Sequence, residues 1–407
     1  MIVFLTDAGN TYPVLVNVTY IQFPLQLGKF WYIFDSYLRP YLIRRFDYLP
    51  GVQFRYAIYQ GTDRLKNFLR RIALMLPRNF FAPRFFLALE RIFVPDFKLF
   101  KFFFKNYRPS LVVTATPGLS FMEAWAILGA KKTGLPSVAI NFSWDNLITY
   151  PRSVRPPDYL ICWNEIIKKE ALDLHGYRPE NVFVSGILRY DHFFKEGDLG
   201  TREEFLISKN LDPGQKTILV ATSTDPDPDL YKRIIRLLQK LKVNILVRIH
   251  PLERLTDYQE FESNKNVRVE LAGTVRQDDS KKGWQVEMGE EDRVNVKKIF
   301  KFCDLNINRS STISLDSLIF DMPVINLDFG TSQVPIVTFP HYWPLIEAGA
   351  VRLAHNEEEL IKFAMMYLDD SSVDSRERQK IVAKLVPFRD GLAYKRNVDF
   401  LAEIIKK

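Results

Sequence analysis

The sequence from Pro109 onward alternates short apolar runs with longer stretches of helical periodicity, which predicts a parallel sheet covered by helices. The first series has predicted strands at 111–115, 137–141, 159–163 and 182–185, with helices at 120–133 and 165–174. A second series has predicted strands at 217–221, 244–249, 267–271, 305–307 and 324–327, with helices at 230–241 and 296–302. This alternation favours two consecutive doubly wound α/β halves.

The chain has 407 residues, enough for two domains that each bury a core. A charged, irregular stretch at 195–203 separates the two series, so we expect a first domain over 1–195 and a second over 196–385. A polar stretch at 274–292 is typical of an exposed insertion or mobile loop. Residues 375–407 have a helical pattern.

Composition restricts the class of protein. A hydrophobic share of 47% with 26% charged residues is typical of a folded soluble chain. Cys162 and Cys303 are the only cysteines, so no disulfide framework is expected and a reducing compartment is favoured. The N-terminus starts directly as a predicted strand without a leader pattern, and the uncharged stretch 8–28 contains two prolines that disfavour a spanning helix. We therefore expect a cytoplasmic protein.

The net charge of +8 is concentrated in residues 61–110, which hold eleven Lys or Arg and three acidic residues, as well as eleven of the 32 phenylalanines. Cationic and aromatic residues interleaved on helices are typical of segments that lie on an anionic membrane. Two alternatives are a phenylalanine core with a solvated basic face, and a nucleic-acid surface. Because no nucleic-acid motif accompanies the patch, we favour peripheral attachment to the membrane and expect no nucleic-acid partner.

The stretch 303–328 reads C-D-L-N-I-N-R-S-S-T-I-S-L-D-S-L-I-F-D-M-P-V-I-N-L-D. A predicted strand runs into a turn of three hydroxyl residues, Ser310, Ser311 and Thr312, and then into a short helix. Such a junction collects backbone N–H groups that bind an anion, of which phosphate is the commonest. Asp316 follows about one and a half helical turns after Ser310, where it can meet a sugar hydroxyl. The pattern suggests nucleotide-sugar chemistry.

Other candidate residues follow predicted strands, where open parallel sheets bind ligands. Ser223 follows the strand 217–221, and His250 ends the next strand in V-R-I-H-P with Arg248 on the same face. Arg248 and His250 are predicted to neutralise a leaving diphosphate. The alternative for His250 is a structural histidine that bonds only to backbone. Arg189 follows the strand 182–185, and His341 follows the last predicted loop; the alternative for His341 is a core histidine.

Asp145 is the candidate general base of the first half, since a carboxylate beside Trp144 can have a raised pKa and accept a proton from a hydroxyl. The alternative is a turn or helix cap formed by Asp145 and Asn146. Acidic residues at 225, 227 and 229 look like a divalent-metal site, but a loop before a helix explains them better. No metal site is therefore predicted.

Several activities lose support because their motifs are absent from the sequence. There is no Gly-rich dinucleotide fingerprint, no phosphate-binding P-loop and no G-x-S-x-G elbow. Dehydrogenase, kinase and hydrolase activities are accordingly disfavoured.

The ordered motifs S-W-D-N-L, W-N-E-I-I-K-K-E-A, V-S-G-I-L-R-Y-D, V-R-I-H-P, N-R-S-S-T-I-S-L-D and H-Y-W-P-L-I resemble bacterial surface-carbohydrate glycosyltransferases of GT-B type. Those proteins are related to CDP-glycerol glycerophosphotransferases and UDP-N-acetylglucosamine 2-epimerases. The resemblance covers about 109–359 and implies two Rossmann-like domains facing a cleft, with the acceptor on the first domain and the donor on the second. It also implies transfer without a metal or cofactor and a C-terminal helix, 386–407, that crosses back to the first domain.

The resemblance implies donor contacts to the phosphates and ribose, which we expect from Ser223, Arg248, His250, Ser310, Ser311, Thr312, Asp316 and His341. Trp144, Asn146 and Arg189 are expected at the acceptor or in the cleft, and Asp145 and His250 in catalysis. The epimerases have E-A-G-L-R and S-G-G-x-Q-E-E where this chain has S-W-D-N-L and S-S-T-I-S-L-D, and the glycerophosphotransferases have W-H-G where it has Trp144, Asp145 and Asn146.

A sugar transferase acting on a surface or capsular glycan, with lipid-linked glycans among the expected acceptors, is therefore favoured. The alternatives are an epimerase, a glycerophosphotransferase-like enzyme and a non-catalytic nucleotide- or glycan-binding protein.

Overall fold

A computed structural model describes residues 2–6, 15–22, 97–117, 121–149, 156–223, 227, 229–251, 253–275, 286–287, 289–330 and 336–407. The chain divides into two compact units. The first comprises residues 1–188 together with 392–407, and the second comprises 189–391. The predicted boundary at 195 lies a few residues beyond the observed one. Most of the predicted basic, Phe-rich segment 61–110 lies outside the described residues.

The second unit contains a six-stranded parallel sheet with the order β14-β13-β12-β7-β8-β9. Its strands are β7 (Thr217–Ala221), β8 (Asn244–Ile249), β9 (Val267–Leu271), β12 (Leu305–Asn308), β13 (Val324–Leu327) and β14 (Arg352–Ala354). The order is that of a doubly wound dinucleotide-type fold, in which the chain starts in the middle of the sheet and builds outward in both directions. The register pairs Ala221 with Asn308 on one side and with Arg248 on the other.

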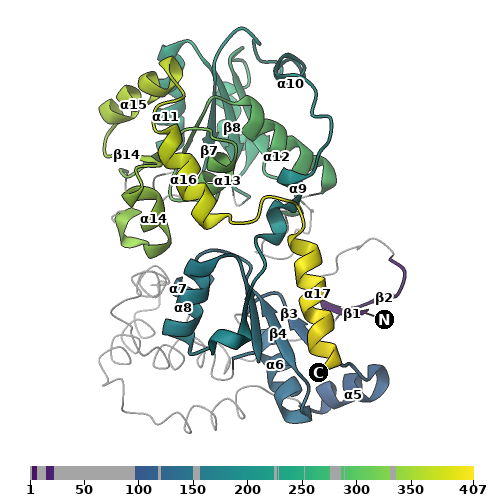
Figure 1. Cartoon of the computed structure of the whole chain (residues 1–407). Helices are drawn as coiled ribbons and strands as arrows, with labels where there is room; N and C mark the ends of the chain where they lie inside the picture. The colour runs from purple at the N-terminus through teal and green to yellow at the C-terminus, as the bar shows by residue number, and fades with distance from the viewer. Residues whose placement is uncertain are drawn as a thin grey trace, which may run out of the picture. The chain divides into compact units, whose positions relative to one another are not determined.

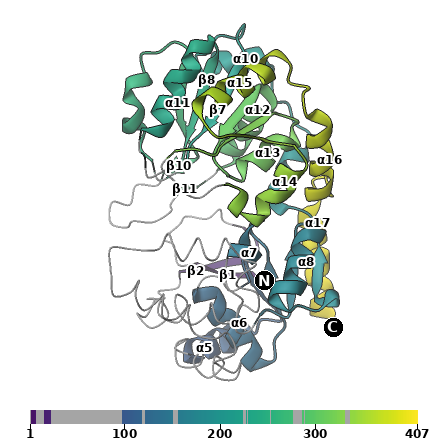
Figure 2. The ribbon, with the colours of Figure 1, turned by 90° about the vertical axis from the view of Figure 1, so that its left-hand side faces the viewer.

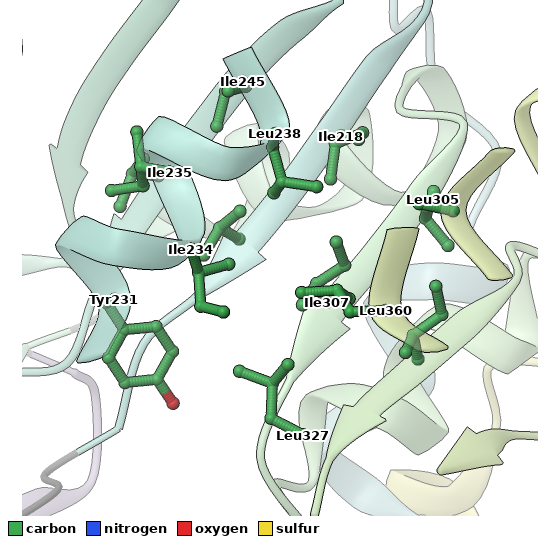
Figure 3. Packing of buried hydrophobic residues seen from close by; sticks show 14 of the residues in the cluster. Ile218, Tyr231, Ile234, Ile235, Leu238, Ile245, Leu305, Ile307, Leu327 and Leu360 are labelled. Atoms are coloured by element: carbon green, nitrogen blue, oxygen red, sulfur yellow. The ribbon is translucent and has the colours of Figure 1, made fainter. Parts of the chain in front are cut away.

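One face of this sheet is covered by α11 (Leu230–Leu238) and α15 (Glu357–Asp369). Figure 3 shows Ile234 and Leu238 of α11 directed toward Ile307 and Ile218 of the strands, with Leu360 of α15 on the same side. All five side chains are completely buried. Burial of an aliphatic side chain contributes about 1.5–3 kcal/mol, so this apolar layer is a major source of the unit's stability.

The remaining helices complete the second unit. Right-handed crossovers place α12 (Glu290–Phe302) and α13 (Ile313–Ile319) on the opposite face, as Figure 1 shows. The helix α13 also packs against α16 (Ser375–Leu385). The shorter helices are α9 (Asp191–Phe194), α10 (Arg202–Ser208), α14 (Trp343–Glu347), and the 3-10 turns η5 (Leu188–Tyr190), η6 (Gln239–Leu241), η7 (Leu255–Phe261), η8 (Ile336–Thr338) and η9 (Pro340–Tyr342).

The first unit contains a four-stranded parallel sheet with the order β3-β4-β5-β6. The strands are β3 (Val112–Thr114), β4 (Ser137–Ile140), β5 (Tyr159–Cys162) and β6 (Val182–Val184), and the intervening helices are α6 (Phe121–Thr133), α7 (Asn146–Thr149), α8 (Glu165–His175) and η4 (Pro179–Asn181). A separate parallel pair joins β1 (Ile2–Thr6) to β2 (Val18–Gln22). The six-stranded sheet and the four-stranded sheet confirm the predicted α/β class with parallel strands.

The C-terminal helix α17 (Ala393–Lys406) belongs to the first unit, and Figure 1 shows it in yellow beside β3 and β4. Its Phe400 ring stacks on Phe183 at 4.5 Å, and its Ile404 packs on Val138 and Ile161. The Arg396 side chain donates to the Ser185 carbonyl at 2.7 Å. One face of this helix thus completes the core over strands that lie more than two hundred residues earlier in the chain.

Three elements differ from their sequence predictions. The helix predicted at 296–302 begins earlier, at Glu290, because three acidic residues in its first turn stabilise the positive helix end without contributing to the apolar pattern. The C-terminal region predicted as continuously helical is interrupted between α16 and α17. At the predicted insertion, β10 (Thr274–Val275) pairs antiparallel with β11 (Val286–Glu287), and the residues between them lie outside the described part.

The helix α5 (Phe97–Tyr107) packs on α6, as Figure 2 shows. The Phe100 ring is buried edge-on against Trp125 at 5.3 Å, and it lies directly over Gly129. A Cβ atom on Gly129 would come within 2.3 Å of the Phe100 ring. The glycine therefore permits the close approach of α5 to α6.

This contact generates a double-mutant prediction. Gly129→Ala adds about 1 kcal/mol of helix propensity but incurs overpacking of about 1–3 kcal/mol against Phe100, so we expect net destabilisation. In a Phe100→Ala background the clash is gone, and the same substitution should stabilise the protein. Urea unfolding of the four proteins measures both effects. If Gly129→Ala destabilises the protein equally with and without the Phe100 ring, the close contact between Gly129 and Phe100 is contradicted.

Candidate functional site

The strand order of the second unit identifies the edge where a ligand site is expected. The chain reverses its direction of growth between the neighbouring strands β7 and β12, and ligands of open parallel sheets bind beyond the carboxyl ends of the strands at such a point. The residues there are Thr222 and Ser223 after β7, and the Arg309–Thr312 turn after β12. Four of the predicted donor contacts, Ser223 and the three hydroxyl residues of the turn, lie at this edge.

The turn after β12 has an unusual backbone. Ser310 has a φ of 33°, in the left-handed region that non-glycine residues rarely occupy, and such conformations concentrate at functional sites. The Ser311 N–H donates to the Asn308 side chain at 3.2 Å, and the Tyr342 hydroxyl donates to the Ser311 carbonyl. Within the described part of the chain, no acceptor is paired with the N–H of Ser310 or Thr312. The turn is thus held by Asn308 and Tyr342, while these two donors have no acceptor among the described residues.

A buried polar layer beneath the turn holds it in place. Asn306 and Asn308 of β12 are completely buried, and they face α13 because successive strand residues alternate between faces. Asn306 donates to the Ser317 hydroxyl at 2.7 Å, and the Asn308 side-chain oxygen accepts from Ser314 at 3.1 Å. Asn326 of β13 donates to the same oxygen at 3.1 Å. Buried groups that are hydrogen-bonded in this way fix one local geometry.

Asp316 is bound by two residues from the start of the second unit. Its Oδ1 accepts from Arg189 Nη2 at 2.6 Å and from the Tyr190 hydroxyl. The guanidinium lies 4.9 Å from the centre of the Tyr190 ring, and burial raises the pKa of Tyr190. Arg189 and Asp316, predicted for different domains, therefore form one ion pair within the second unit.

Arg248 differs from its predicted role. Its side chain is 6% exposed and donates to Glu270 at 2.6 Å and to both oxygens of Asp292 at 2.9 and 3.0 Å. Two carboxylates therefore pair with this guanidinium through its Nη1 and Nη2 atoms, which favours a structural role over the predicted contact to a diphosphate. The sequence prediction missed this because the partners lie 22 and 44 residues further along the chain.

His250 and Ser223 lie at the ends of neighbouring strands. Burial lowers the pKa of His250, while the nearby Glu253 carboxylate opposes that shift. The Ser223 hydroxyl lies 2.8 Å from the Tyr231 hydroxyl, and burial raises the pKa of Tyr231 to about 12. Both predicted residues are accordingly positioned at the carboxyl edge of the sheet.

His341 lies in η9, a half-buried position between two aromatic rings. Its ring centre is 5.9 Å from that of Phe339 and 5.3 Å from that of Tyr342. The Tyr342 hydroxyl bonds to the Ser311 carbonyl, so the Tyr342 side chain lies between His341 and the Ser310–Thr312 turn. Its role as a donor contact stays a prediction.

The predicted base of the first unit lies in a tight turn after β4. The Ser143 hydroxyl donates to Asp145 Oδ1 at 2.5 Å, and the Asn146 side chain accepts the Ser143 N–H at 2.8 Å. Trp144 and Asn146 are buried, each 6% exposed, whereas Asp145 is half-buried. Trp144 and Asn146 therefore shape the turn, and Asp145 is its half-buried member, with Oδ1 bonded to Ser143 and Oδ2 3.4 Å from the Thr149 hydroxyl.

A second carboxyl group faces this turn. Glu170 of α8, which packs against α7, has its pKa raised to about 8 by burial and, secondly, by the negative charge of Asp145. Its Oε2 has no hydrogen-bond partner among the described residues. Glu170 could not be predicted as part of the site because it lies in a regular amphipathic helix.

The acidic residues considered for a metal are engaged elsewhere. Asp227 pairs with Arg233 at 2.7 Å, and Asp229 pairs with Lys232 at 3.0 Å. Asp225 lies outside the described residues. Within those residues, no cluster of three or more His, Cys, Asp or Glu side chains is arranged to hold a metal ion.

Sequence reasoning missed Arg309, the residue that immediately precedes the turn. Its Nη1 donates to the Phe329 carbonyl at 3.2 Å, and a Cβ on Gly330 would lie 3.4 Å from that nitrogen. Its positive charge also lowers the pKa of Tyr231 against the effect of burial. Arg309 therefore lies between the ends of β7, β12 and β13.

No protein-family model and no curated protein sequence matches this chain. Solved structures are similar to it. A putative UDP-N-acetylglucosamine 2-epimerase from Listeria monocytogenes has a TM-score of 0.50 at 13% identity, covering 82% of this chain and 84% of that one. S. aureus MnaA with UDP has a TM-score of 0.52 at 14% identity, covering 88% and 94%. UDP-GlcNAc 2-epimerase from Neisseria meningitidis, bound to UDP-GlcNAc, has a TM-score of 0.50 at 13% identity, covering 90% of this chain and 97% of that one.

These similarities establish the fold. The chain is an α/β protein of GT-B type, as its sequence predicted. At this level of identity the comparisons do not extend to the activity.

Glu170 gives a pH-dependent stability prediction. Its pKa in the folded protein, about 8, is above the ordinary 4.5, so the unfolded chain loses this proton first as the pH rises. The free energy of unfolding therefore falls as the pH rises from 4.5 to about 8, and it stays lower above about pH 8. Glu170→Gln should raise the free energy of unfolding by several kcal/mol at about pH 8.5 and leave it nearly unchanged at about pH 4, below the window in which the wild-type protein loses stability. Urea unfolding at both pH values measures this, with the exposed Glu180→Gln as control; equal effects at the two values would contradict it.

Proposed function

We propose that the chain is a metal-independent glycosyltransferase that moves a sugar from a nucleoside diphosphate donor to a surface or capsular glycan. The observation that carries the proposal is the Ser310–Thr312 turn at the switch point of a GT-B-type sheet, with its left-handed residue and two N–H donors that have no acceptor in the described part of the chain. Backbone donors at such a point suit the phosphates of a nucleotide. UDP and UDP-GlcNAc are bound by the similar structures from S. aureus and N. meningitidis, which supports this donor class.

On the donor side, the Ser310, Ser311 and Thr312 turn binds the diphosphate and Asp316 binds the ribose. Asp316 is only 13% exposed, and its Oδ1 is held by Arg189 and Tyr190, so its orientation is set before a donor arrives. A prepositioned carboxylate loses little side-chain entropy when it accepts a ribose hydroxyl.

The cation for the leaving diphosphate is assigned to Arg309 instead of Arg248. Arg309 is half-buried and directly precedes the turn at the switch point, whereas Arg248 forms ion pairs with Glu270 and Asp292. His250 is the second group that stabilises the departing diphosphate, in its protonated form. Ser223 and His341 complete the donor contacts in this assignment.

On the acceptor side, Asp145 of the first unit takes the proton of the attacking hydroxyl. The Ser143 hydroxyl holds one carboxylate oxygen, and Trp144 and Asn146 fix the surrounding turn. As the acceptor oxygen forms a bond to the anomeric carbon of the sugar, the bond from that carbon to the diphosphate oxygen breaks. The nucleoside diphosphate then departs as the leaving group. Glycan hydroxyls, including those of lipid-linked glycans, fit this chemistry.

An epimerase is the second candidate because two of the similar structures are a UDP-GlcNAc 2-epimerase from N. meningitidis and a putative one from L. monocytogenes. The two activities differ in their need for an acceptor. Incubation of the protein with UDP-GlcNAc alone gives the 2-epimer if it is an epimerase and leaves the sugar configuration unchanged if it is a transferase. Formation of the 2-epimer would overturn the proposed function.

We also propose that α5 attaches the protein to an anionic membrane surface. The helix carries three lysines and no acidic residue. While Phe100 is buried, Phe102 is 57% exposed, and Lys101, Lys105 and Arg108 are exposed around it. An exposed aromatic ring among cations suits the headgroup region of an anionic bilayer. Among the described residues, no helix is long and apolar enough to cross a membrane.

The donor assignment predicts how nucleotide affinity depends on Arg309. A thermal-shift panel of UDP-, CDP-, GDP- and CMP-linked sugars first identifies the base. For that base, wild-type protein should bind the nucleoside diphosphate about tenfold or more tightly than the monophosphate, because a charge-assisted contact adds about 1.5–3 kcal/mol. Arg309→Ala should remove this difference, and Arg309→Lys should retain part of it. Isothermal titration calorimetry measures the ratio.

Arg248→Lys is the matched control for that experiment. It removes the bidentate contact to Asp292 and should lower the melting temperature without changing the ratio of diphosphate to monophosphate affinity. A collapsed ratio in Arg248→Lys, together with an unchanged ratio in Arg309→Ala, would reject the reassignment.

The membrane proposal predicts salt-sensitive binding to vesicles. Each lysine near an anionic surface contributes about 1 kcal/mol, so Lys101→Glu with Lys105→Glu should reduce binding to phosphatidylglycerol-containing vesicles more than tenfold. Phe102→Ser should also weaken it. Flotation with and without the anionic lipid measures binding, and Lys240→Glu with Lys265→Glu, two exposed positions in the second unit, is the charge-matched control. Equal flotation of both double variants would contradict the assignment to α5.

A further inference from the structure

The carboxylate of Glu253 lies at the centre of the hydrogen bonds that fix the end of β8. The Glu253 N–H donates to the His250 carbonyl at 2.8 Å, and the Glu253 Oε2 accepts the His250 N–H at 2.9 Å. The main chain of Glu253 therefore donates to His250, and its side chain accepts from His250, within the same four-residue turn. Pro251, inside this turn, further restricts the backbone because its ring fixes φ.

The same carboxylate reaches two other elements. Its Oε2 accepts from the hydroxyl of Thr222, the first residue after β7, and Thr222 Oγ1 accepts the His250 N–H at 2.8 Å. Its Oε1 accepts from the Tyr258 hydroxyl of η7 at 2.9 Å. Thr222 and Tyr258 are buried, 6% and 2% exposed. One carboxylate thus joins the ends of β7 and β8 to the helix that follows them.

The neighbouring half of the switch point is fixed by different means. The turn after β12 is held by buried amides and hydroxyls, whereas the end of β8 is held by a negatively charged group. A carboxylate there influences His250 electrostatically as well as sterically. Burial lowers the pKa of His250 and the charge of Glu253 raises it, so Glu253 favours the protonated imidazole that a diphosphate needs.

We propose that Glu253 is a positioning residue for His250: it holds the His250 backbone at the end of β8 and places a negative charge near the imidazole. The inference rests on the proposed function only in the role given to His250 at the leaving diphosphate. It adds a residue that no sequence motif above had selected. Tyr258 and Thr222 support Glu253, and Glu253 itself does not touch the donor in this scheme.

Two substitutions separate the geometric from the electrostatic part. In Glu253→Gln the amide oxygen can still accept from His250 and Thr222, while the amide nitrogen faces the Tyr258 hydroxyl, so the turn is kept and the charge is lost. In Glu253→Ala both are lost. Glu262→Gln, an exposed residue of the following turn, is the matched control. Thr222→Val removes one contact to the carboxylate but keeps its charge.

The test combines a readout of His250 that needs no activity with a kinetic one. Nuclear magnetic resonance titration of the imidazoles, with His250 assigned by its absence in His250→Gln, gives the pKa of His250 in each protein. We expect Glu253→Gln to lower this pKa with the melting temperature unchanged, and the control to leave it unchanged. Turnover of the donor identified by the panel should fall about threefold in Glu253→Gln and about tenfold or more in Glu253→Ala, mainly in kcat.

The outcomes distinguish this inference from the proposed function. A lowered His250 pKa with lowered kcat in Glu253→Gln supports the positioning role. The inference is overturned if the pKa of His250 is unchanged in Glu253→Gln and the lower kcat of Glu253→Ala is accompanied by a lower melting temperature. In that case Glu253 has only a structural role. Should wild-type protein bind no nucleotide, the proposed function fails, and the pKa of His250 in Glu253→Gln still decides whether Glu253 acts on His250.

Discussion

The pairing between β12 and α13 through buried amides and hydroxyls determines the geometry of the candidate donor site. In β12 the sequence L-N-I-N directs two aliphatic side chains to the α11 and α15 face and two asparagines to the α13 face. Asparagines two residues apart on the strand meet Ser314 and Ser317, three residues apart on the helix. The hydrogen bonds between these amides and hydroxyls hold the helix in register with the strand, although Asn306 Oδ1 and Asn308 Nδ2 have no partner among the described residues. The Ser310–Thr312 turn is the short link between these two fixed elements.

The positive charges of the second unit are divided between structural and candidate binding roles by their surroundings. Arg248 occupies an almost fully buried position between two carboxylates, and removal of either charge would leave the other uncompensated. Arg309 directly precedes the Ser310–Thr312 turn after β12, and its Nη1 donates to the Phe329 carbonyl after β13. Arg189 is used to hold Asp316. Identical side chains thus acquire different roles from the carboxylates that the fold places beside them.

Much of the fold could be predicted from the sequence because its strands are short, apolar and bounded by polar turns. The strands 217–221, 244–249 and 267–271 were predicted at the bounds that the structure has, since each is a short run without a competing helical period, and the first two are completely buried. The position of Ser223, His250 and the Ser310 turn at one edge followed from the parallel topology. The pairing of Arg248 with Glu270 and Asp292, and of Arg189 with Asp316, could not be predicted, because it depends on which side chains meet across long sequence separations. Glu253 was overlooked for the same reason, since its partners come from three elements.

The central claim is that the edge between β7 and β12 binds the diphosphate of a nucleotide. Hydrogen–deuterium exchange with and without the nucleoside diphosphate selected by the thermal-shift panel tests it most directly, because it reports where backbone N–H groups become protected. The account predicts slower exchange in peptides that contain Ser310, Ser311 and Thr312. Protection by a bound nucleotide that leaves these peptides unchanged would contradict it.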